Sequence, residues 1–419
     1  MPQLIPSNWQ AWSIWLAIVL FPIFAASAQA GASYAFTWLV IMGLLFGWKF
    51  LPELTKPEKQ LFIGFAILVV VVVLTVIFGN NLKEDLRGLD KYNAMLLAFP
   101  AYLAIRRFVK EPGRPLIGGL FLAPLGALML GVGWDFSRII PSLSLSARLD
   151  GAYINSIILS NLTALFSILL LASTILILRH PVARFIGTLM GLLGIVIVVA
   201  TASRNGMFFL PVGLALMLFL LHRHLSKRHW VILTVIAVVL IGLFQLNPNN
   251  QAKQRASIAI ETLVHGNNAD HSTTSRLAMW QDSILIWKNH PILGVGPGSF
   301  RSTIDAMQAS GETQTAYTYT HAHSIYFQAV ATIGALGLLA ILWFVFARPF
   351  LFGWSAWRHA LTPWQSFYAA GIMLTVAAFM FFGLTEAWFS RNPMIRSYLI
   401  CLLVFFAGMI QTRHQASSR

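Results

Sequence analysis

Apolar runs of membrane-spanning length dominate this chain of 419 residues. A helix needs about 20 residues to cross the hydrocarbon core of a bilayer, and twelve runs come close to that length. Hydrophobic residues make up 57% of the chain and charged residues only 10%, too few to cover a soluble domain of this size. We therefore predict an all-α polytopic membrane protein with about twelve transmembrane helices. The predicted spans are 11–29, 34–50, 60–79, 92–109, 115–134, 153–178, 182–202, 205–222, 229–246, 322–346, 364–384 and 394–411.

The basic residues predict how these spans are oriented. Twelve spans place both termini on one side, and that side carries sixteen Lys and Arg residues, against eight in the short loops of the other side. Positive charge gathers in cytoplasmic loops, so we expect cytoplasmic termini and, in a bacterium, a periplasmic location for the long loop. This asymmetry also accounts for much of the net charge of +15. Because the arginines are not clustered on a soluble domain, we expect no nucleic-acid partner.

The longest polar interval, residues 247–320, separates nine predicted spans in residues 1–246 from three in residues 321–419. Apolar residues at helical spacing predict an amphipathic helix near 275–289, which lies on the membrane surface or packs on the bundle. The stretch PILGVGPGSF follows, and its glycines, Gly296 among them, permit a tight turn. Such a turn can present backbone N–H groups to an anion, but a plain loop turn explains it equally well.

Arginines occur in several of the loops predicted to face outward, where arginine is normally sparse. Arg204 interrupts nearly continuous apolar sequence in TASRNG, Arg148 lies in ARLDGAYIN, Arg276 begins the helix of the long loop, and Arg87 lies in NNLKEDLRGLDKY. Arginine at membrane depth is costly unless it is paired or lines a wet cavity. One interpretation is that Arg204 extends to the interface; the other is that it binds an anion. Several arginines beside an apolar bundle would suit a lipid-linked diphosphate.

A pair of histidines, His321 and His323 in THAHSIYFQ, lies where the long loop re-enters the membrane. Three roles are open: a metal site, a helix cap and a general base. The metal site lacks a third ligand at suitable spacing, and Cys401, the one cysteine, lies in an apolar run. The base is favoured, because imidazole titrates near the working pH and here stands at the membrane surface opposite arginines.

These motifs, in this order, resemble those of the bacterial O-antigen ligases, within the superfamily that also contains O-antigen polymerases and O-linking oligosaccharyltransferases. The motifs are SRNG at 203–206, SRLAMW at 275–280, HPILGVGPGSF at 290–300 and HAHSIYFQ at 321–328. The family's histidine is often followed by Asn, whereas Ser324 follows His323 here. Either histidine is therefore a candidate base, and His323 is favoured because it directly precedes an apolar helix.

The resemblance implies a GT-C-like, metal-independent transferase in the bacterial inner membrane. It would move a glycan from undecaprenyl diphosphate to a sugar hydroxyl of the lipid A–core oligosaccharide, at the periplasmic face and among membrane lipids. By motif, Arg204 and Arg276 would contact the donor diphosphate, with Arg148 beside them, and His323 would activate the acceptor hydroxyl. Gly296 and Glu386 would have supporting roles. No cofactor is expected, because the donor is already activated and the chain contains no P-loop sequence.

Three other functions are compatible with parts of the sequence. An O-antigen polymerase would use the same donor with a second lipid-linked glycan as acceptor, and composition does not separate it from a ligase. Protein-O-glycosylating relatives usually carry an additional C-terminal periplasmic portion. A secondary transporter also suits twelve spans, but the sequence shows no inverted repeat and few acidic residues within the spans.

Overall fold

The computed structural model describes residues 8–79, 81–143, 147–225, 253–254, 257–258, 261, 271–313 and 319–417. In these ranges the regular secondary structure is entirely helical, with no strand. Eight described helical segments are long and apolar enough to span a membrane. The prediction of an all-α polytopic membrane protein is thus confirmed. The predicted span 229–246 lies outside the described residues.

The membrane-length helices agree closely with the predicted runs, including the short separation at Thr201–Ser203. They are α3 (Lys56–Ile77), α6 (Gly113–Gly131), α8 (Ser156–Leu176), α9 (Pro181–Ala200), α10 (Arg204–Leu221), α18 (Pro363–Phe382), α19 (Asn392–Ser417), and the continuous segment Gly334–Arg358 made of α16 (Gly334–Ala340), a π-helical stretch (Ile341–Ala347) and α17 (Arg348–Arg358). Three further apolar helices are shorter: α1 (Trp9–Ala25), α2 (Gly31–Phe46) and α5 (Asn93–Phe108).

Burial separates a central group of helices from a peripheral one. Nearly every residue of α8, α18 and α19 is buried within the described chain. By contrast, α3 and α9 leave large apolar side chains exposed, such as Ile63, Val70 and Phe185. A soluble protein rarely exposes such long apolar stripes, so the outer helices present them to lipid. The bundle therefore has a packed interior and a lipid-facing shell.

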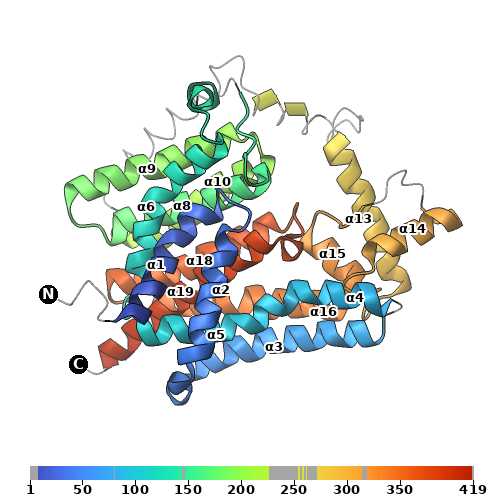
Figure 1. Cartoon of the computed structure of the whole chain (residues 1–419), viewed down its shortest axis with the longest axis horizontal. Helices are drawn as coiled ribbons and strands as arrows, with labels where there is room; N and C mark the ends of the chain where they lie inside the picture. The colour runs from blue at the N-terminus through green and yellow to red at the C-terminus, as the bar shows by residue number, and fades with distance from the viewer. Residues whose placement is uncertain are drawn as a thin grey trace.

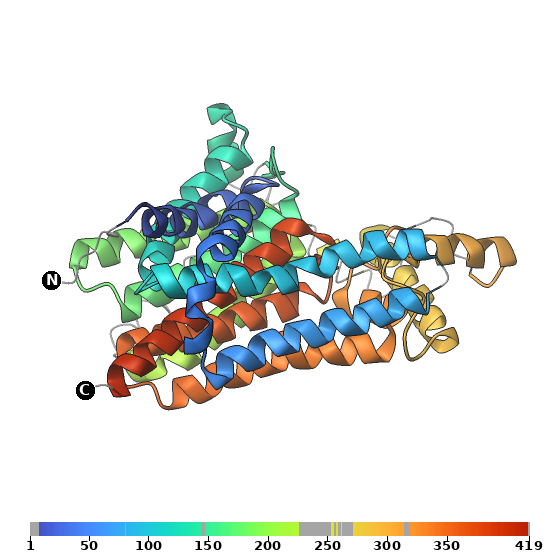
Figure 2. The same ribbon diagram turned by 60° about the horizontal axis from the view of Figure 1, so that its bottom comes forward.

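The two ends of the bundle differ. Figures 1 and 2 show both chain termini at one end and helices α13 (His271–Asn289) and α14 (Phe300–Ser310) at the other. The short helix α4 (Leu82–Leu89) lies at the same end as α13 and α14 (Figure 1). The distribution of basic residues predicts that the end with α13 and α14 faces the periplasm. We call the end with α13 and α14 the loop end.

The predicted span 322–346 differs from the structure. A short helix, α15 (Ile325–Thr332), comes first, and the membrane-length helix begins only at Gly334, whose φ is +66°. At this break, the backbone of the glycine-rich stretch forms hydrogen bonds with carbonyl groups at the end of α15. Val295 N donates to Ala331 O at 3.1 Å, and Gly296 N donates to Thr332 O at 2.9 Å. The apolar run is continuous in sequence, so hydropathy alone did not reveal the break.

The glycine-rich stretch is also tied to α4. Asp85 is fully buried, and its Oδ1 accepts hydrogen bonds from Gly298 N at 3.0 Å and Ser299 Oγ at 2.8 Å. Gly296 has φ of +112°, and a Cβ there would lie 2.2 Å from the Asp85 carboxylate oxygens. Of the two interpretations of these glycines, the structure therefore supports a tightly packed turn at Gly296.

Candidate functional site

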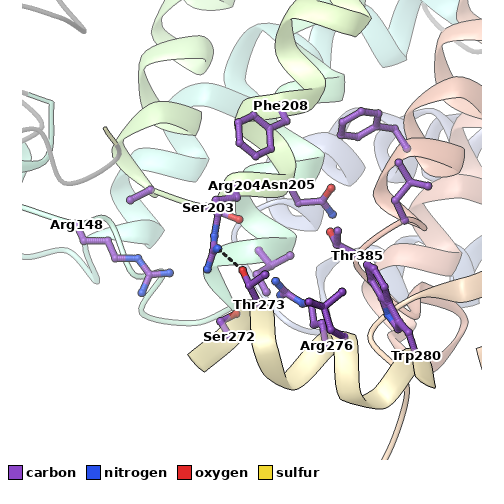
Figure 3. Close-up of a pocket in the computed structure, with 15 residues that line it drawn as sticks. Arg148, Ser203, Arg204, Asn205, Phe208, Ser272, Thr273, Arg276, Trp280 and Thr385 are labelled. Atoms are coloured by element: carbon purple, nitrogen blue, oxygen red, sulfur yellow. Dashed lines mark hydrogen bonds between the residues drawn. The ribbon is translucent and has the colours of Figure 1, made fainter. Parts of the chain in front are cut away.

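A cavity of about 370 Å³ opens at the loop end between α8, α10, α13 and the segment after α18. Figure 3 shows charged and polar side chains meeting there from segments far apart in sequence. It is lined by Arg148, Ile157, Ala202, Ser203, Arg204, Asn205, Phe208, Ser272, Thr273, Arg276, Leu277, Trp280, Phe381, Leu384 and Thr385. The three arginines proposed from sequence to bind a diphosphate, Arg148, Arg204 and Arg276, therefore share one cavity.

Arg204 is placed by an unusual turn between α9 and α10. Ala202 has φ of +48°, a left-handed conformation that non-glycine residues rarely adopt, and Arg204 is the first residue of α10. The guanidinium donates from Nη1 to Thr273 Oγ1 of α13 at 3.0 Å, as Figure 3 shows. Strained backbone at a cavity often marks a functional position. The turn directs Arg204 toward Thr273 on the opposite side of the cavity.

Arg148 braces this turn from the other side. Its Nε donates to Thr201 O at 2.9 Å, its Nη2 donates to Ser156 Oγ at 2.8 Å, and its Nη1 lies 3.1 Å from Asp150 Oδ1. The guanidinium thus holds the backbone next to Arg204 while it lines the cavity wall. Arg148 therefore supports the turn that carries Arg204.

Arg276 enters the cavity from α13, near the N-terminal ends of two helices. Ser203 and Arg204 begin α10, while Ser272 and Thr273 lie in the first turn of α13. Helix N-termini carry partial positive charge and unpaired N–H groups, which favour a bound anion. Two guanidinium groups and two helix starts therefore favour an anion in this cavity.

Helix α13 has a mixed buried face. Met279, Asp282, Ser283 and Ile286 are buried, whereas Leu277, Ile284 and Trp287 are between 37% and 40% exposed. Thr313 Oγ1 donates a hydrogen bond to Asp282 Oδ1 at 2.6 Å. A polar pair therefore occupies part of the inner face, and part of the apolar stripe remains on the surface.

The histidines lie next to the cavity, just before α15. His323 has φ of +47°, and its ring centroid is 4.2 Å from that of His321. His323 Nδ1 lies 3.8 Å from Glu386 Oε2, and Glu386 Oε1 accepts a hydrogen bond from Arg391 Nε at 3.2 Å. Glu386 is 1% exposed and His323 is 27% exposed. A buried carboxylate thus faces an accessible imidazole, an arrangement suited to stabilising that imidazole when it gains a proton.

Charges around the pair distinguish the two histidines. Burial, together with the charges of His323, Arg391 and Lys91, lowers the pKa of His321 to about 4, against the attraction of Glu386. Burial acts to raise the pKa of Glu386, but His323 and Arg391 outweigh burial and hold that pKa below its usual value. His321 is therefore neutral at pH 7 and resists protonation. Glu386 is ionised and lies within ion-pair distance of His323.

Two contacts join the histidine segment to the cavity. Trp280, which lines the cavity, donates from Nε1 to Ala322 O at 3.0 Å, between the two histidines. On the other side, Ile325 N donates to Gly383 O at 2.9 Å, and Thr385, next to Glu386, lines the cavity. Neither histidine is itself part of the lining. They lie behind the wall formed by Trp280 and Thr385.

The structure supplies the third potential metal ligand that was not identified from sequence. His321, His323 and Glu386 each place one donor atom within 4.8 Å of the others. However, Arg391 already binds the carboxylate of Glu386, and the charge of Lys91 acts on His321. These positive charges oppose a bound divalent cation, since like charges repel each other.

The remaining predicted residues lie elsewhere. Gly296 packs on Asp85 and supports the loop end without reaching the cavity. Arg87 lies on the exposed side of α4, and it is not among the cavity-lining residues. Sequence reasoning gave no role to Trp280 or Asp85, whose contacts join residues far apart in sequence. It counted Arg391, in TEAWFSRN, only among the outward-facing arginines and did not pair it with Glu386.

Comparison with known proteins agrees with the motifs. Residues 189–342 match the family described as O-antigen ligase. An uncharacterized protein of Haemophilus influenzae is 23% identical over 407 residues, which cover 93% of this chain and 96% of that protein. The family match contains Arg204, Arg276 and both histidines of the pair, but ends before Glu386. Over residues 189–342, this chain is therefore similar to the O-antigen ligase family.

Proposed function

We propose that the protein is an O-antigen ligase that transfers a glycan from undecaprenyl diphosphate to a sugar hydroxyl of lipid A–core oligosaccharide. The observation that carries this proposal is the position of the His323–Glu386 pair directly behind a cavity containing Arg204 and Arg276. The cavity has charges suited to a diphosphate, and the adjacent imidazole has a carboxylate suited to stabilising its protonated form.

The proposed reaction is a direct displacement. The acceptor hydroxyl oxygen attacks the anomeric carbon of the first donor sugar while the bond from that carbon to the phosphate oxygen breaks. His323 takes the hydroxyl proton, using Nε2, because Nδ1 faces Glu386. The electron pair of the broken bond leaves on undecaprenyl diphosphate, where Arg204 and Arg276 stabilise the developing charge. The anomeric configuration is inverted.

The surroundings of His323 favour it over His321 as the base. A base must accept a proton during the reaction, and burial together with nearby cations keeps His321 neutral. His323 is more suitable because it faces a buried carboxylate and remains partly exposed. His321 packs against its ring and restricts its orientation.

Reconstitution tests this function. The purified protein is supplied with undecaprenyl-diphosphate-linked glycan and one of two acceptors, lipid A–core or a second lipid-linked glycan. Product with lipid A–core is expected. Product only with the second lipid-linked glycan would identify a polymerase instead. His323→Ala should retain less than a tenth of wild-type transfer, whereas His290→Ala, which removes an exposed histidine after α13, should retain all of it.

The orientation in the inner membrane requires a separate experiment. We propose that the loop end faces the periplasm. The one cysteine, Cys401, is buried and should not react with a polar label. In Glu312→Cys, the new thiol would follow α14, whereas in Arg358→Cys it would end α17 near the other end of the bundle. A membrane-impermeant maleimide should label the first variant in intact spheroplasts and the second only after lysis. The reverse pattern would overturn the proposed orientation.

A further inference from the structure

Trp280 occupies a position that the proposed reaction leaves without a role. It follows Arg276 by four residues, so both side chains project from the same face of α13, and both line the cavity. Its Nε1 donates to the backbone carbonyl of Ala322, next to His323. The indole therefore lies between the arginines proposed to hold the diphosphate and the histidine proposed to act as base.

The indole is held rigidly. One face stacks on Phe327, with ring centroids 4.9 Å apart and an angle of 14° between the planes. The hydrogen bond to Ala322 O prevents rotation of the ring in its own plane. Since Phe327 covers one face, the opposite face and the edge remain to line the cavity. Trp280 thus presents an apolar surface whose orientation is determined before any ligand binds.

In the proposed reaction, the first donor sugar lies in the cavity next to Trp280. Its anomeric carbon is bonded to the diphosphate on one side and is attacked by the hydroxyl that His323 deprotonates on the other. Sugar rings have apolar C–H faces that pack on aromatic rings, while their hydroxyl groups point outward to polar partners. Asn205 and Thr385 supply polar groups on the same cavity lining. The cavity therefore combines an apolar plate with polar groups, as carbohydrate sites require.

We propose that Trp280 is a positioning residue on which the first sugar of the lipid-linked donor packs. The proposal rests on the proposed function, since it assumes that the arginines hold the donor diphosphate. It makes the donor sugar part of what the cavity recognises, in addition to the lipid diphosphate. By aligning the ring, Trp280 would orient the anomeric carbon for attack in line with the leaving phosphate oxygen.

The alternative is that Trp280 only anchors the histidine segment through Ala322. Phenylalanine separates the two roles, because Trp280→Phe keeps a flat apolar face but loses the N–H, whereas Trp280→Leu loses both. Trp287 provides a matched control on the same helix: it is 38% exposed, donates to Pro291 O at 3.1 Å and does not line the cavity. Trp287→Leu should have no effect on donor binding.

The test compares binding of two ligands to the full-length protein in detergent: undecaprenyl diphosphate, and the same lipid bearing one sugar. Trp280→Leu should weaken binding of the sugar-bearing ligand by about three- to tenfold, the range of an aromatic contact, and leave bare undecaprenyl diphosphate unchanged. Trp280→Phe should remain within about twofold of wild type for both. If Trp280→Leu does not fold, Trp280→Phe still distinguishes the two roles. If the indole is only an anchor, Trp280→Phe should lower the rate of transfer while the affinity for both ligands stays unchanged.

Other results would overturn the assignment in distinct ways. Equal loss of both ligands in Trp280→Leu, or no loss of either, would remove Trp280 as a sugar platform. A failure of the proposed function looks different. In that case the wild-type protein would bind neither ligand, or Arg204→Lys would leave binding of bare undecaprenyl diphosphate unchanged.

Discussion

Glu386→Gln is the substitution that tests the catalytic geometry most directly. It replaces a carboxylate by an amide of nearly the same shape, so it removes the charge facing His323 without opening a cavity. If His323 takes a proton in the transition state, the carboxylate stabilises the transition state more than the ground state. The loss should therefore appear mainly in kcat, with KM for the donor changed little.

The expected size follows from the distances. Two unit charges separated by the 3.8 Å between His323 Nδ1 and Glu386 Oε2 attract by about 4 kcal/mol at an effective dielectric constant of about 20. Arg391 neutralises part of the carboxylate from 3.2 Å, and solvent reaches the partly exposed imidazole. We therefore expect about half of that energy, about 2 kcal/mol, which corresponds to about a 30-fold lower kcat.

The assay is transfer by purified, reconstituted protein, with thermal unfolding as a check on folding. Glu312→Gln, at an exposed glutamate of the same end, should be unaffected. Arg391→Gln distinguishes catalysis from structure: it leaves the carboxylate opposite His323, so activity should fall by less than about fivefold. If Glu386→Gln stays within twofold of wild type, or if Arg391→Gln loses as much as Glu386→Gln, the carboxylate does not act through His323.

Three further predictions concern other parts of the molecule. Arg204→Lys and Arg276→Lys should each lower transfer at least about tenfold, because a point charge does not replace a bidentate fork; full activity in both would exclude diphosphate binding there. Since the pKa of His321 is lowered from 6.5 to about 4, the folded state disfavours its protonation, so stability should decline as pH falls from about 6.5 toward 4. His321→Gln should flatten that decline in the unfolding temperature, and an unchanged pH dependence would contradict it. Gly296→Ala combines positive φ with a clash and should lower the unfolding temperature more than Gly311→Ala, where φ is +77° but the space is open; an equal effect would show that the clash is relieved at no cost.

Hydropathy predicted the long helices of the bundle well. In lipid, backbone N–H and C=O groups can form hydrogen bonds only with each other, so a long apolar run must be helical. Hydropathy was misleading at the break before Gly334, where the backbone of residues 291–296 supplies the missing hydrogen bonds. It also gave no indication that Asp282 of α13 is buried with Thr313 as its partner. Both features depend on polar groups that distant segments satisfy, and a local sequence pattern does not contain those segments.

The candidate site was likewise predictable from sequence only in part. Arg204, Arg276 and His323 were proposed from short motifs, and the structure brings the two arginines into one cavity with His323 beside it. The carboxylate that faces His323 comes from Glu386, and helices α15, α16, α17 and α18 lie between these two residues in the sequence. No spacing rule links these residues. Arg87 had the right residue type in a loop predicted to be outward-facing, but it lies on the exposed side of α4.

The loop that carries Thr385 and Glu386 joins α18 to α19, the last helix of the chain. Proteins are made from the N-terminus, so Arg148 and Arg204 are inserted long before this loop emerges. The cavity has no complete wall, and His323 has no carboxylate partner, until α18 has been inserted. The proposed pair of His323 and Glu386 therefore forms only after α18 has emerged. A chain that ends prematurely within α18 would retain the arginines but lack Glu386, the carboxylate proposed to support proton transfer.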